Sequence, residues 1–232
     1  MNPLGRKNGG FPYLCESCAD DLPWKEQAKS CQRCGNLTAE KDRLRCPACS
    51  ARKYHFHQVW CAFYYADPLR QWILDLKFHR QESTIHLLGR LLSQAPFGTK
   101  PLENVDWVAP VPLHPKRLRE RGFNQSLLLA HALLTRAKTN HSAQESQQPT
   151  LLPDLLVRNR HTKPQFELLS DEREANVADA FAVNPSHLDA LQGSRVLLVD
   201  DLLTSGATLN ACAKALRSSG ARQVTALVLA RA

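Results

Sequence analysis

The sequence lacks any long apolar run. No apolar stretch reaches the roughly 18 residues that a helix needs to cross a bilayer. Residues 1–10 are polar and glycine-rich, without the apolar segment of a signal peptide. We therefore expect a cytoplasmic protein with no membrane insertion.

Large aliphatic residues are scarce in residues 1–55, so this segment needs a cross-link, such as a bound metal ion or disulfides, to fold. Six of the eight cysteines are arranged as Cys-x-x-Cys pairs. The pairs are Cys15/Cys18, Cys31/Cys34 and Cys46/Cys49. This spacing lets both thiolates of a pair face one tetrahedral ion, and in a cytosolic chain it favours zinc over disulfides.

The second and third pairs, with Gly35 in a tight turn, complete a four-thiolate set. Such a set leaves no position for water, so we predict a structural zinc ion; the alternative is a group of reduced, unliganded thiols. The first pair, Cys15 and Cys18, is a candidate for a second zinc. Its further ligands would come from His55, His57 and Cys61, unless these are ordinary surface or packing residues. Cys212 and Cys61 also fit a core position.

A strand, a turn and a helix follow one another near the C-terminus. Val196–Val199 is a continuous apolar run typical of a buried parallel strand, and Gly220 suits the end of the following helix, in which apolar residues recur at helical spacing. Asp200 and Asp201 follow the strand, at the edge where open α/β sheets bind ligands. Carboxylates there accept hydrogen bonds from vicinal hydroxyls.

The turn after these aspartates contains only small residues, and Gly206 lets its backbone approach a ligand closely. Its N–H groups open a helix whose positive dipole end favours an anion. Together the acidic pair and the turn predict a site for ribose 5-phosphate. The alternative is a generic strand–turn–helix with two solvated aspartates.

A basic segment follows residues 105–113, which we predict to form a short buried strand broken by prolines. It contains Lys116, Arg117, Arg119 and Arg121. Guanidinium groups bind phosphate oxygens bidentately, which favours a pyrophosphate site, although the start of a basic surface helix has the same composition. The net charge of +8 has its basic excess within residues 1–125, which suits nucleic acid or polyphosphate, or a solvated surface.

The remaining elements are predicted from hydrophobic periodicity. We expect strands at 60–65 and 155–158, helices at 69–78, 85–92 and 124–136, and a polar loop at 138–150. Basic and aromatic residues lie close to the cysteines in the sequence. They could contact single-stranded nucleic acid, or they could simply pack against the rest of the protein. These are Arg33, Lys41, Arg43, Arg45, Arg52, Lys53, Tyr54 and Phe56.

Residues 196–209 resemble the phosphoribosyl pyrophosphate (PRPP) signature of type I phosphoribosyltransferases. With the cysteine pairs and further short motifs, the whole chain resembles the ComF/GntX family of phosphoribosyltransferase-like proteins, associated with natural competence and DNA uptake. The motifs are Leu76-Lys-Phe78, Val111-Pro-Leu113, Arg121-Gly-Phe-Asn-Gln125, Arg158 with Thr162 and Gln165, and Arg173 with Asn176-Val177. The resemblance implies an α/β fold with a mostly parallel sheet flanked by helices (59–232), preceded by a small zinc ribbon (1–58).

The resemblance also implies roles. Asp200 and Asp201 would bind the ribose hydroxyls, and Lys116, Arg117 and Arg121 the pyrophosphate of PRPP with its Mg²⁺. The 5′-phosphate would lie on Thr204, Ser205, Gly206, Ala207 and Thr208. Residues 160–183, with Arg158, Lys163 and Arg173 as candidate contacts, would form a lid over PRPP. Some relatives carry four cysteine pairs, which would place a missing pair upstream of Cys15.

Two functions fit these implied roles. The first is a phosphoribosyltransferase in which pyrophosphate departs from C1 and a nitrogen nucleophile adds, with no acceptor or general base assigned. The second is a PRPP- or nucleotide-sensing module, or a single-stranded-DNA-binding adaptor that docks on a competence helicase or another uptake protein.

Overall fold

The computed structural model describes residues 14–26, 29–38, 46–47, 49, 52–78, 82–140, 148–160, 177 and 179–232. The helices are α1 (Glu16–Asp20), α3 (Leu69–Phe78), α4 (Glu82–Ser93), α5 (Pro115–Arg121), α6 (Gln125–Asn140), α8 (Leu188–Leu191) and α9 (Ala207–Ser218), with 3₁₀ turns at Lys100–Leu102 and Pro185–His187. The strands are β1 (Val59–Tyr64), β2 (Trp107–Pro110), β3 (Thr150–Leu151), β4 (Leu156–Arg158), β5 (Phe181–Val183), β6 (Arg195–Leu203) and β7 (Gln223–Arg231). Within these ranges, every helix is too short or too polar to cross a lipid bilayer.

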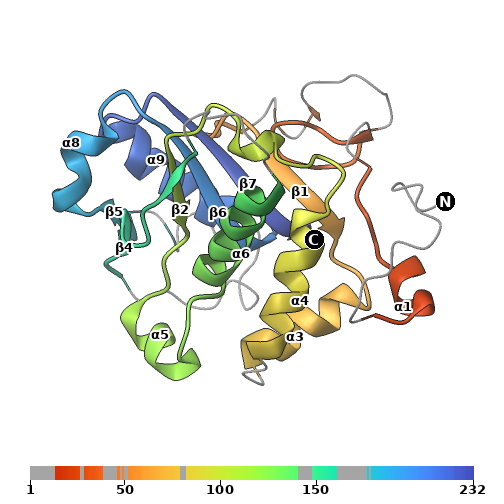
Figure 1. The fold of residues 1–232 in the computed structure, drawn as a ribbon. Coiled ribbons are helices and arrows are strands. Elements are labelled where there is room, and N and C mark those ends of the chain that lie inside the picture. The colour runs from red at the N-terminus through yellow and green to blue at the C-terminus, as the bar shows by residue number, and fades with distance from the viewer. Residues whose placement is uncertain are drawn as a thin grey trace.

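The central sheet has five strands in the order β1-β7-β6-β2-β3, and all its neighbouring strands are parallel. A separate antiparallel pair, β4 and β5, lies beside it. Figure 1 shows helices on both faces of the sheet. The predicted mostly parallel sheet flanked by helices is therefore confirmed.

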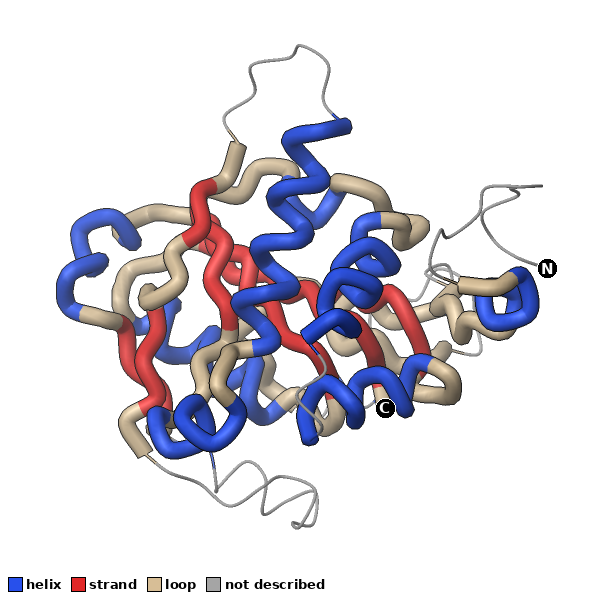
Figure 2. Tube along the Cα trace, turned by 60° about the horizontal axis from the view of Figure 1, so that its bottom comes forward, coloured by secondary structure: helices blue, strands red, loops and turns tan. Residues whose placement is uncertain are grey.

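Strand β6 lies in the middle of the sheet and is buried on both faces. Leu197 and Val199 pack in the core formed with α3, α4 and α6, whereas Val196 and Leu198 pack in the core formed with α9 and the β4–β5 pair. Figure 2 shows the strands side by side between these helices. Burial on both faces explains why the strand is continuously apolar instead of alternating.

The N-terminal segment runs along the outer edge of β1. The Lys25 N–H donates to the Ala62 carbonyl at 2.9 Å, and the Tyr64 N–H donates to the Pro23 carbonyl at 2.8 Å. The rings of Trp24 and Phe63 lie 4.3 Å apart, centroid to centroid. The cysteine-rich segment is thus joined to the sheet by backbone bonds and by the core, while the division at 58/59 stays a prediction.

Strand β6 and helix α6 each extend four residues beyond their predicted ends. Strand β6 continues beyond Val199 to Leu203, because Leu202 and Leu203 still pair with Ala230 and Arg231 of β7. Helix α6 continues through Asn140, so the predicted polar loop starts later than residue 138. The first difference matters for function, since it places both aspartates within the last part of the strand.

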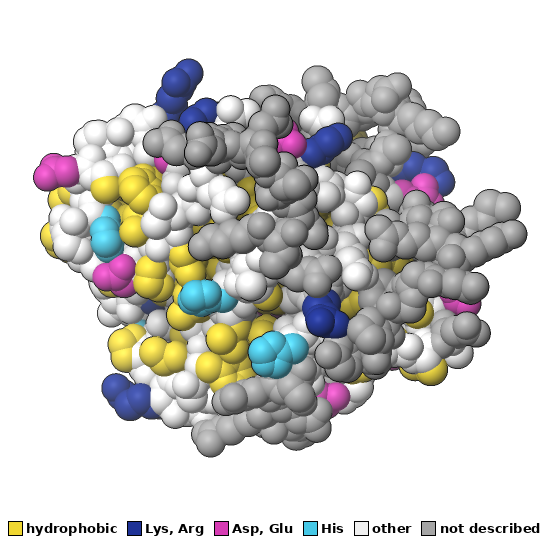
Figure 3. All heavy atoms as spheres, in the orientation of Figure 1, with side chains coloured by type: hydrophobic (Ala, Val, Ile, Leu, Met, Phe, Trp, Pro, Cys, Tyr) yellow, Lys and Arg dark blue, Asp and Glu magenta, His cyan; other side chains and the backbone are white. Residues whose placement is uncertain are grey.

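A groove of about 340 Å³ lies between α4 and α6. Its lining includes Ile85, Leu128 and two exposed histidines, His86 and His131. Figure 3 shows hydrophobic and histidine side chains gathered on this face of the molecule. The described residues that line it include no carboxylate, unlike the site at the end of β6.

Candidate functional site

Asp200 and Asp201 are buried side by side near the carboxyl end of β6, with relative exposures of 8% and 4%. Asp200 Oδ1 accepts a hydrogen bond from Ser126 Oγ at 2.8 Å and another from the Asp201 N–H at 2.9 Å. Asp201 Oδ2 lies 2.5 Å from Lys77 Nζ, at the end of α3. Because both carboxylates are buried, the alternative of two solvated aspartates is wrong.

The two carboxyl groups differ in their tendency to ionise. Burial, reinforced by the charge of Asp201, raises the pKa of Asp200 to about 7. Burial also opposes ionisation of Asp201, but the ammonium group of Lys77 outweighs it and lowers the pKa of Asp201 below its usual value. Near neutral pH the pair therefore holds one firm negative charge and one carboxyl group close to its titration midpoint.

Arginines from two elements converge on this pair. Burial lowers the pKa of Arg121, at the end of α5, and the nearby charges of Asp201 and Asp200 oppose that shift. Burial likewise lowers the pKa of Arg158, where the charge of Asp200 again acts against it. Arg117 is close enough to repel both guanidinium groups. Cations and carboxylates thus share one end of the sheet, as a site for pyrophosphate and ribose needs.

The basic segment forms a short helix, α5, which Figure 1 shows projecting at the same end of the molecule as the carboxyl ends of the strands. His114 caps its start, accepting from the Lys116 N–H at 3.2 Å. Lys116 and Arg119 are exposed, whereas Arg117 and Arg121 are partly covered. Of the basic residues predicted to bind pyrophosphate, Arg121 lies near the acidic pair, Arg117 lies near Arg121, and Lys116 is exposed to solvent.

The Gly-Phe-Asn-Gln segment joins α5 to α6. Gly122 ends α5 in the left-handed conformation, with φ of 88°. Asn124 donates to the Val111 carbonyl at 3.1 Å and accepts from the Ser126 N–H at 3.0 Å, which caps α6. Gln125 accepts from Arg121 Nη1 at 2.6 Å. The segment therefore fixes the two residues, Ser126 and Arg121, that face the aspartates.

The predicted phosphate loop, Thr204–Thr208, connects β6 to α9. Gly206 has a φ of 84° and is the N-cap of α9. Ser205 Oγ accepts from the Ala207 N–H at 3.3 Å. Among the residues that the structure describes, the N–H groups of Ser205 and Gly206 have no acceptor. Unbonded amides at a helix start, next to two carboxylates, suit a phosphate ester of a vicinal diol.

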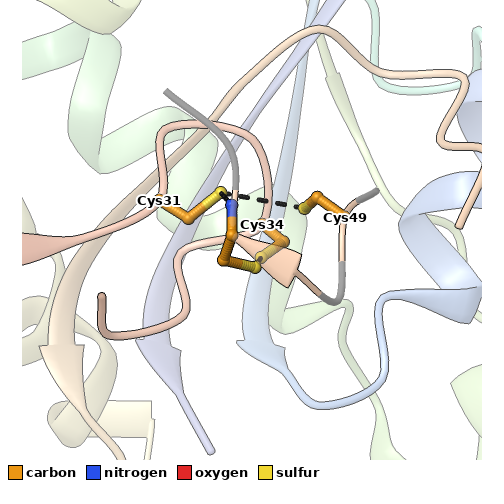
Figure 4. Close-up of side chains that lie close together, drawn as sticks. Cys31, Cys34 and Cys49 are labelled. Carbon is orange, nitrogen blue, oxygen red and sulfur yellow. Dashed lines mark hydrogen bonds between the residues drawn. The ribbon is translucent and has the colours of Figure 1, made fainter. Parts of the chain in front are cut away.

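Cys31, Cys34, Cys46 and Cys49 come together in one buried cluster, with their sulfur atoms all within 4.8 Å of one another. Sγ of Cys31 lies 3.7 Å from Sγ of Cys49, and Sγ of Cys34 lies 3.4 Å from Sγ of Cys46. A tetrahedral ion with bonds of about 2.3 Å separates its sulfurs by about 3.8 Å. The four side chains therefore fit a structural metal ion; Figure 4 shows three of them pointing toward one another.

The cluster also favours ionised sulfur at Cys31. Burial opposes the charge, but hydrogen bonds from the N–H groups of Cys34, Cys46 and Arg33 outweigh it and lower the pKa of the Cys31 thiol to about 7. Gly35, with φ of 70°, makes the predicted tight turn, and its N–H donates to the Cys31 carbonyl at 2.8 Å. N–H bonds to sulfur are the usual second-sphere support of a thiolate metal site.

Cys15 and Cys18 lie near each other in and before α1, apart from the four-cysteine cluster. In the described part of the chain, neither His55, His57 nor Cys61 joins them in a group of three ligands. Their role as a second metal site stays a prediction. Cys61 and Cys212 are fully buried in the core, as expected.

Several predicted residues fall outside the described ranges. They are Lys41, Arg43 and Arg45 of the cysteine-rich segment and Thr162, Lys163, Gln165, Arg173 and Asn176 of the predicted lid.

The phosphoribosyl transferase domain model matches residues 127–232. The chain is 31% identical over 231 residues to competence protein F of Haemophilus influenzae, which covers 97% of this chain and 92% of that protein. It is 31% identical over 232 residues to DNA utilization protein YhgH of Escherichia coli K12, with 99% and 93% covered. The chain belongs to the ComF/GntX family of phosphoribosyltransferase-like proteins. Competence protein ComFC of Bacillus subtilis is 25% identical over 248 residues, covering 94% of the chain and 93% of that protein.

Three further residues complete the site of this ComF/GntX family member, and none of them was assigned from the sequence. Lys77 pairs with Asp201, Ser126 with Asp200, and Arg231 holds the carbonyl of Leu203 at 3.0 Å. Lys77 lies within the Leu76-Lys-Phe78 motif and Ser126 directly follows Gly-Phe-Asn-Gln, so each had a sequence signal in its neighbourhood. Arg231 is the penultimate residue of the chain and had none.

Proposed function

We propose that this chain binds PRPP at the carboxyl end of β6 and acts in the use of incoming DNA. The observation that carries the proposal is the pair of buried carboxylates followed directly by unbonded loop amides at the start of α9. In this arrangement Asp200 and Asp201 accept from the ribose hydroxyls, and the loop from Thr204 to Thr208 binds the 5′-phosphate. The names of the relatives, which refer to competence and DNA utilization, support the cellular setting.

The pyrophosphate half of PRPP belongs beside Arg117 and Arg121. Arg121 is close to the aspartates and Arg117 is close to Arg121, and a guanidinium group binds phosphate oxygens in two-point fashion. The two carboxylates are hard oxygen donors, so they would help to hold the Mg²⁺ that accompanies PRPP, and its charge would offset that of the departing pyrophosphate. The transferase reaction that this geometry favours breaks the bond between C1 and pyrophosphate, which leaves, and forms a bond between C1 and a nitrogen atom of the acceptor.

Calorimetric titration with PRPP and Mg²⁺ tests the binding step. We expect the wild-type protein to bind and Asp200→Asn to bind at least ten-fold more weakly, because an uncharged amide is a poorer acceptor for hydroxyls and a poorer Mg²⁺ ligand. Asp106→Asn, at the opposite end of the sheet, is the control and should bind like wild type. Equal binding by wild type and Asp200→Asn, or binding by neither, would contradict the proposal.

A turnover assay distinguishes a phosphoribosyltransferase from a protein that only senses PRPP. Release of pyrophosphate is measured with PRPP, Mg²⁺ and a panel of nucleobases and other nitrogen acceptors. Steady release that depends on one acceptor supports the phosphoribosyltransferase. Tight PRPP binding without release across the panel would instead assign the chain a PRPP-sensing role in the cytoplasm.

A second candidate function, binding of single-stranded DNA, is favoured by α5. This helix has no buried residue, exposes Lys116 and Arg119, and lies beside the proposed PRPP site. We expect the affinity for a single-stranded oligonucleotide to fall steeply with salt and to decrease in Lys116→Ala/Arg119→Ala. Absence of binding at low salt would rule this function out.

A further inference from the structure

Three successive carbonyl groups, of Leu203 at the end of β6 and of Thr204 and Ser205 in the phosphate loop, accept hydrogen bonds from arginines. The Leu203 carbonyl accepts from Arg231 Nη1 at 3.0 Å, and the Thr204 carbonyl accepts from the same nitrogen. The Ser205 carbonyl accepts from Arg52 Nη1 at 3.4 Å. In a trans peptide the C=O and the following N–H point in opposite directions, so these bonds aim the N–H groups of residues 204–206 away from the arginines.

Arg231 connects this loop to the cysteine cluster. Its Nε donates to Asn36 Oδ1 at 3.1 Å, and its Nη2 donates to the same oxygen. Asn36 follows Cys34 and Gly35 in the metal-binding turn, and its carbonyl accepts from the Cys31 N–H at 2.8 Å. One guanidinium group therefore bridges the cysteine turn and two carbonyls of the loop.

Tyr54 makes a second connection. Its ring packs against the four-cysteine cluster, and a Cβ placed on Gly206 would lie 3.4 Å from its Cε1 atom. Arg33, between two of the cysteines, donates to the Tyr54 carbonyl at 2.6 Å. Arg52, which holds Ser205, lies three positions after Cys49 in the sequence. Arg231, Arg52 and Tyr54, which contact the loop, are thus each bonded to, packed against or close in sequence to the four-cysteine cluster.

We propose that the four-cysteine metal site positions the phosphate loop, with Arg231 as the main positioning residue, and thereby sets the affinity for a phosphate ester. The identity of that ester rests on the proposed function, whereas the coupling of metal and loop does not. Loss of the metal releases the turn that holds Asn36 and Arg33, so Arg231 and Tyr54 lose their anchors. Asp200 and Asp201 keep their own partners, Ser126 and Lys77.

The test compares Arg231→Met and Asn36→Ala with Arg195→Met. Arg195 is the matched control, because it pairs with Asp106 at the other end of β6. Metal content and melting temperature establish that each full-length variant is folded and loaded. We expect faster amide hydrogen exchange at residues 204–208 in Arg231→Met and Asn36→Ala, and in wild type treated with a chelator, but not in Arg195→Met.

The affinities for two ligands show whether Arg231→Met affects only the phosphate loop or the whole binding site. Ribose 5-phosphate, which needs the loop, should bind about ten-fold more weakly to Arg231→Met, as expected for the loss of hydrogen bonds from a charged donor. Inorganic pyrophosphate with Mg²⁺, held by Arg117 and Arg121, should bind unchanged. Equal loss for both ligands would assign Arg231 a purely structural role and overturn the inference.

Unchanged exchange at residues 204–208 after metal removal, and in Arg231→Met, would also overturn it. If exchange responds to the metal while wild type binds neither PRPP nor ribose 5-phosphate, the coupling stands and the proposed function fails. The two conclusions are therefore tested separately.

Discussion

Replacing Asp200 by asparagine should stabilise the protein at pH 8 while it weakens PRPP binding. Burial beside Asp201 raises the pKa of Asp200 from 3.8 to about 7, so the folded state resists its ionisation. An asparagine has nearly the same shape and can still accept the bonds from Ser126 and the Asp201 N–H at its Oδ1. The substitution therefore removes a buried charge without leaving a cavity.

The magnitude follows from linkage. A group with a pKa of about 7 when folded and about 4 when unfolded binds more protons in the folded state, so stability falls as the pH rises from about 4 to about 7. A shift of about three pKa units corresponds to roughly 4 kcal/mol above pH 7. We expect Asp200→Asn to recover a large part of this, with the gain shrinking towards zero as the pH falls to about 4.

Urea unfolding of both proteins at several pH values between 4 and 8 measures this difference. Asp106→Asn is the control, because we expect this substitution to lower the free energy of unfolding where Asp200→Asn raises it. A hydrogen bond from Arg195 lowers the pKa of Asp106, so its charge contributes stability above pH 4 that the substitution removes. A lower stability of Asp200→Asn than of wild type at pH 8, or a difference that does not change with pH, would refute the reasoning.

Three further predictions concern neighbouring groups. Lys77→Met leaves a buried carboxylate without its ion pair and should cost roughly 3 kcal/mol in urea unfolding at pH 7; an unchanged midpoint would contradict the ion pair. PRPP affinity should rise with pH as Asp200 ionises near pH 7, and Ser126→Ala, which removes a bond that lowers this pKa, should move the rise to higher pH in calorimetric titrations. An unshifted profile would argue against Asp200 as the titrating group. Cys34→Ser should lose about one metal ion per chain by elemental analysis, whereas Cys212→Ala should retain it.

Local patterns were enough to predict much of this molecule. The apolar run from Val196 to Val199, followed by Asp200 and Asp201, predicted a buried strand that ends in a ligand site, because only a strand covered on both faces is apolar throughout. The spacing of Cys31, Cys34 and the third pair predicted a four-sulfur cluster, because two residues between cysteines bring both sulfurs to one point. Each of these features is encoded within a few consecutive residues.

The partners of the aspartates could not be predicted in this way. Lys77 lies more than a hundred positions before Asp201 in the sequence, and Ser126 lies 74 positions before Asp200. Each meets its carboxylate only because α3 and α6 pack on the same face of the sheet. The resulting difference in pKa between two adjacent aspartates follows from burial and from which one faces an ammonium group, and neither is visible in the sequence.

The sequence by itself determined the buried strand β6, the acidic pair with its small-residue turn, and the cysteine cluster, since periodicity and spacing act over short distances. Only the tertiary structure decided which basic residues face the aspartates and that Arg231, next to the C-terminus, connects the cysteine turn to the phosphate loop. A side chain that bridges segments 195 positions apart has no local pattern, because its position depends on the register of β7 and the docking of the N-terminal segment on the sheet.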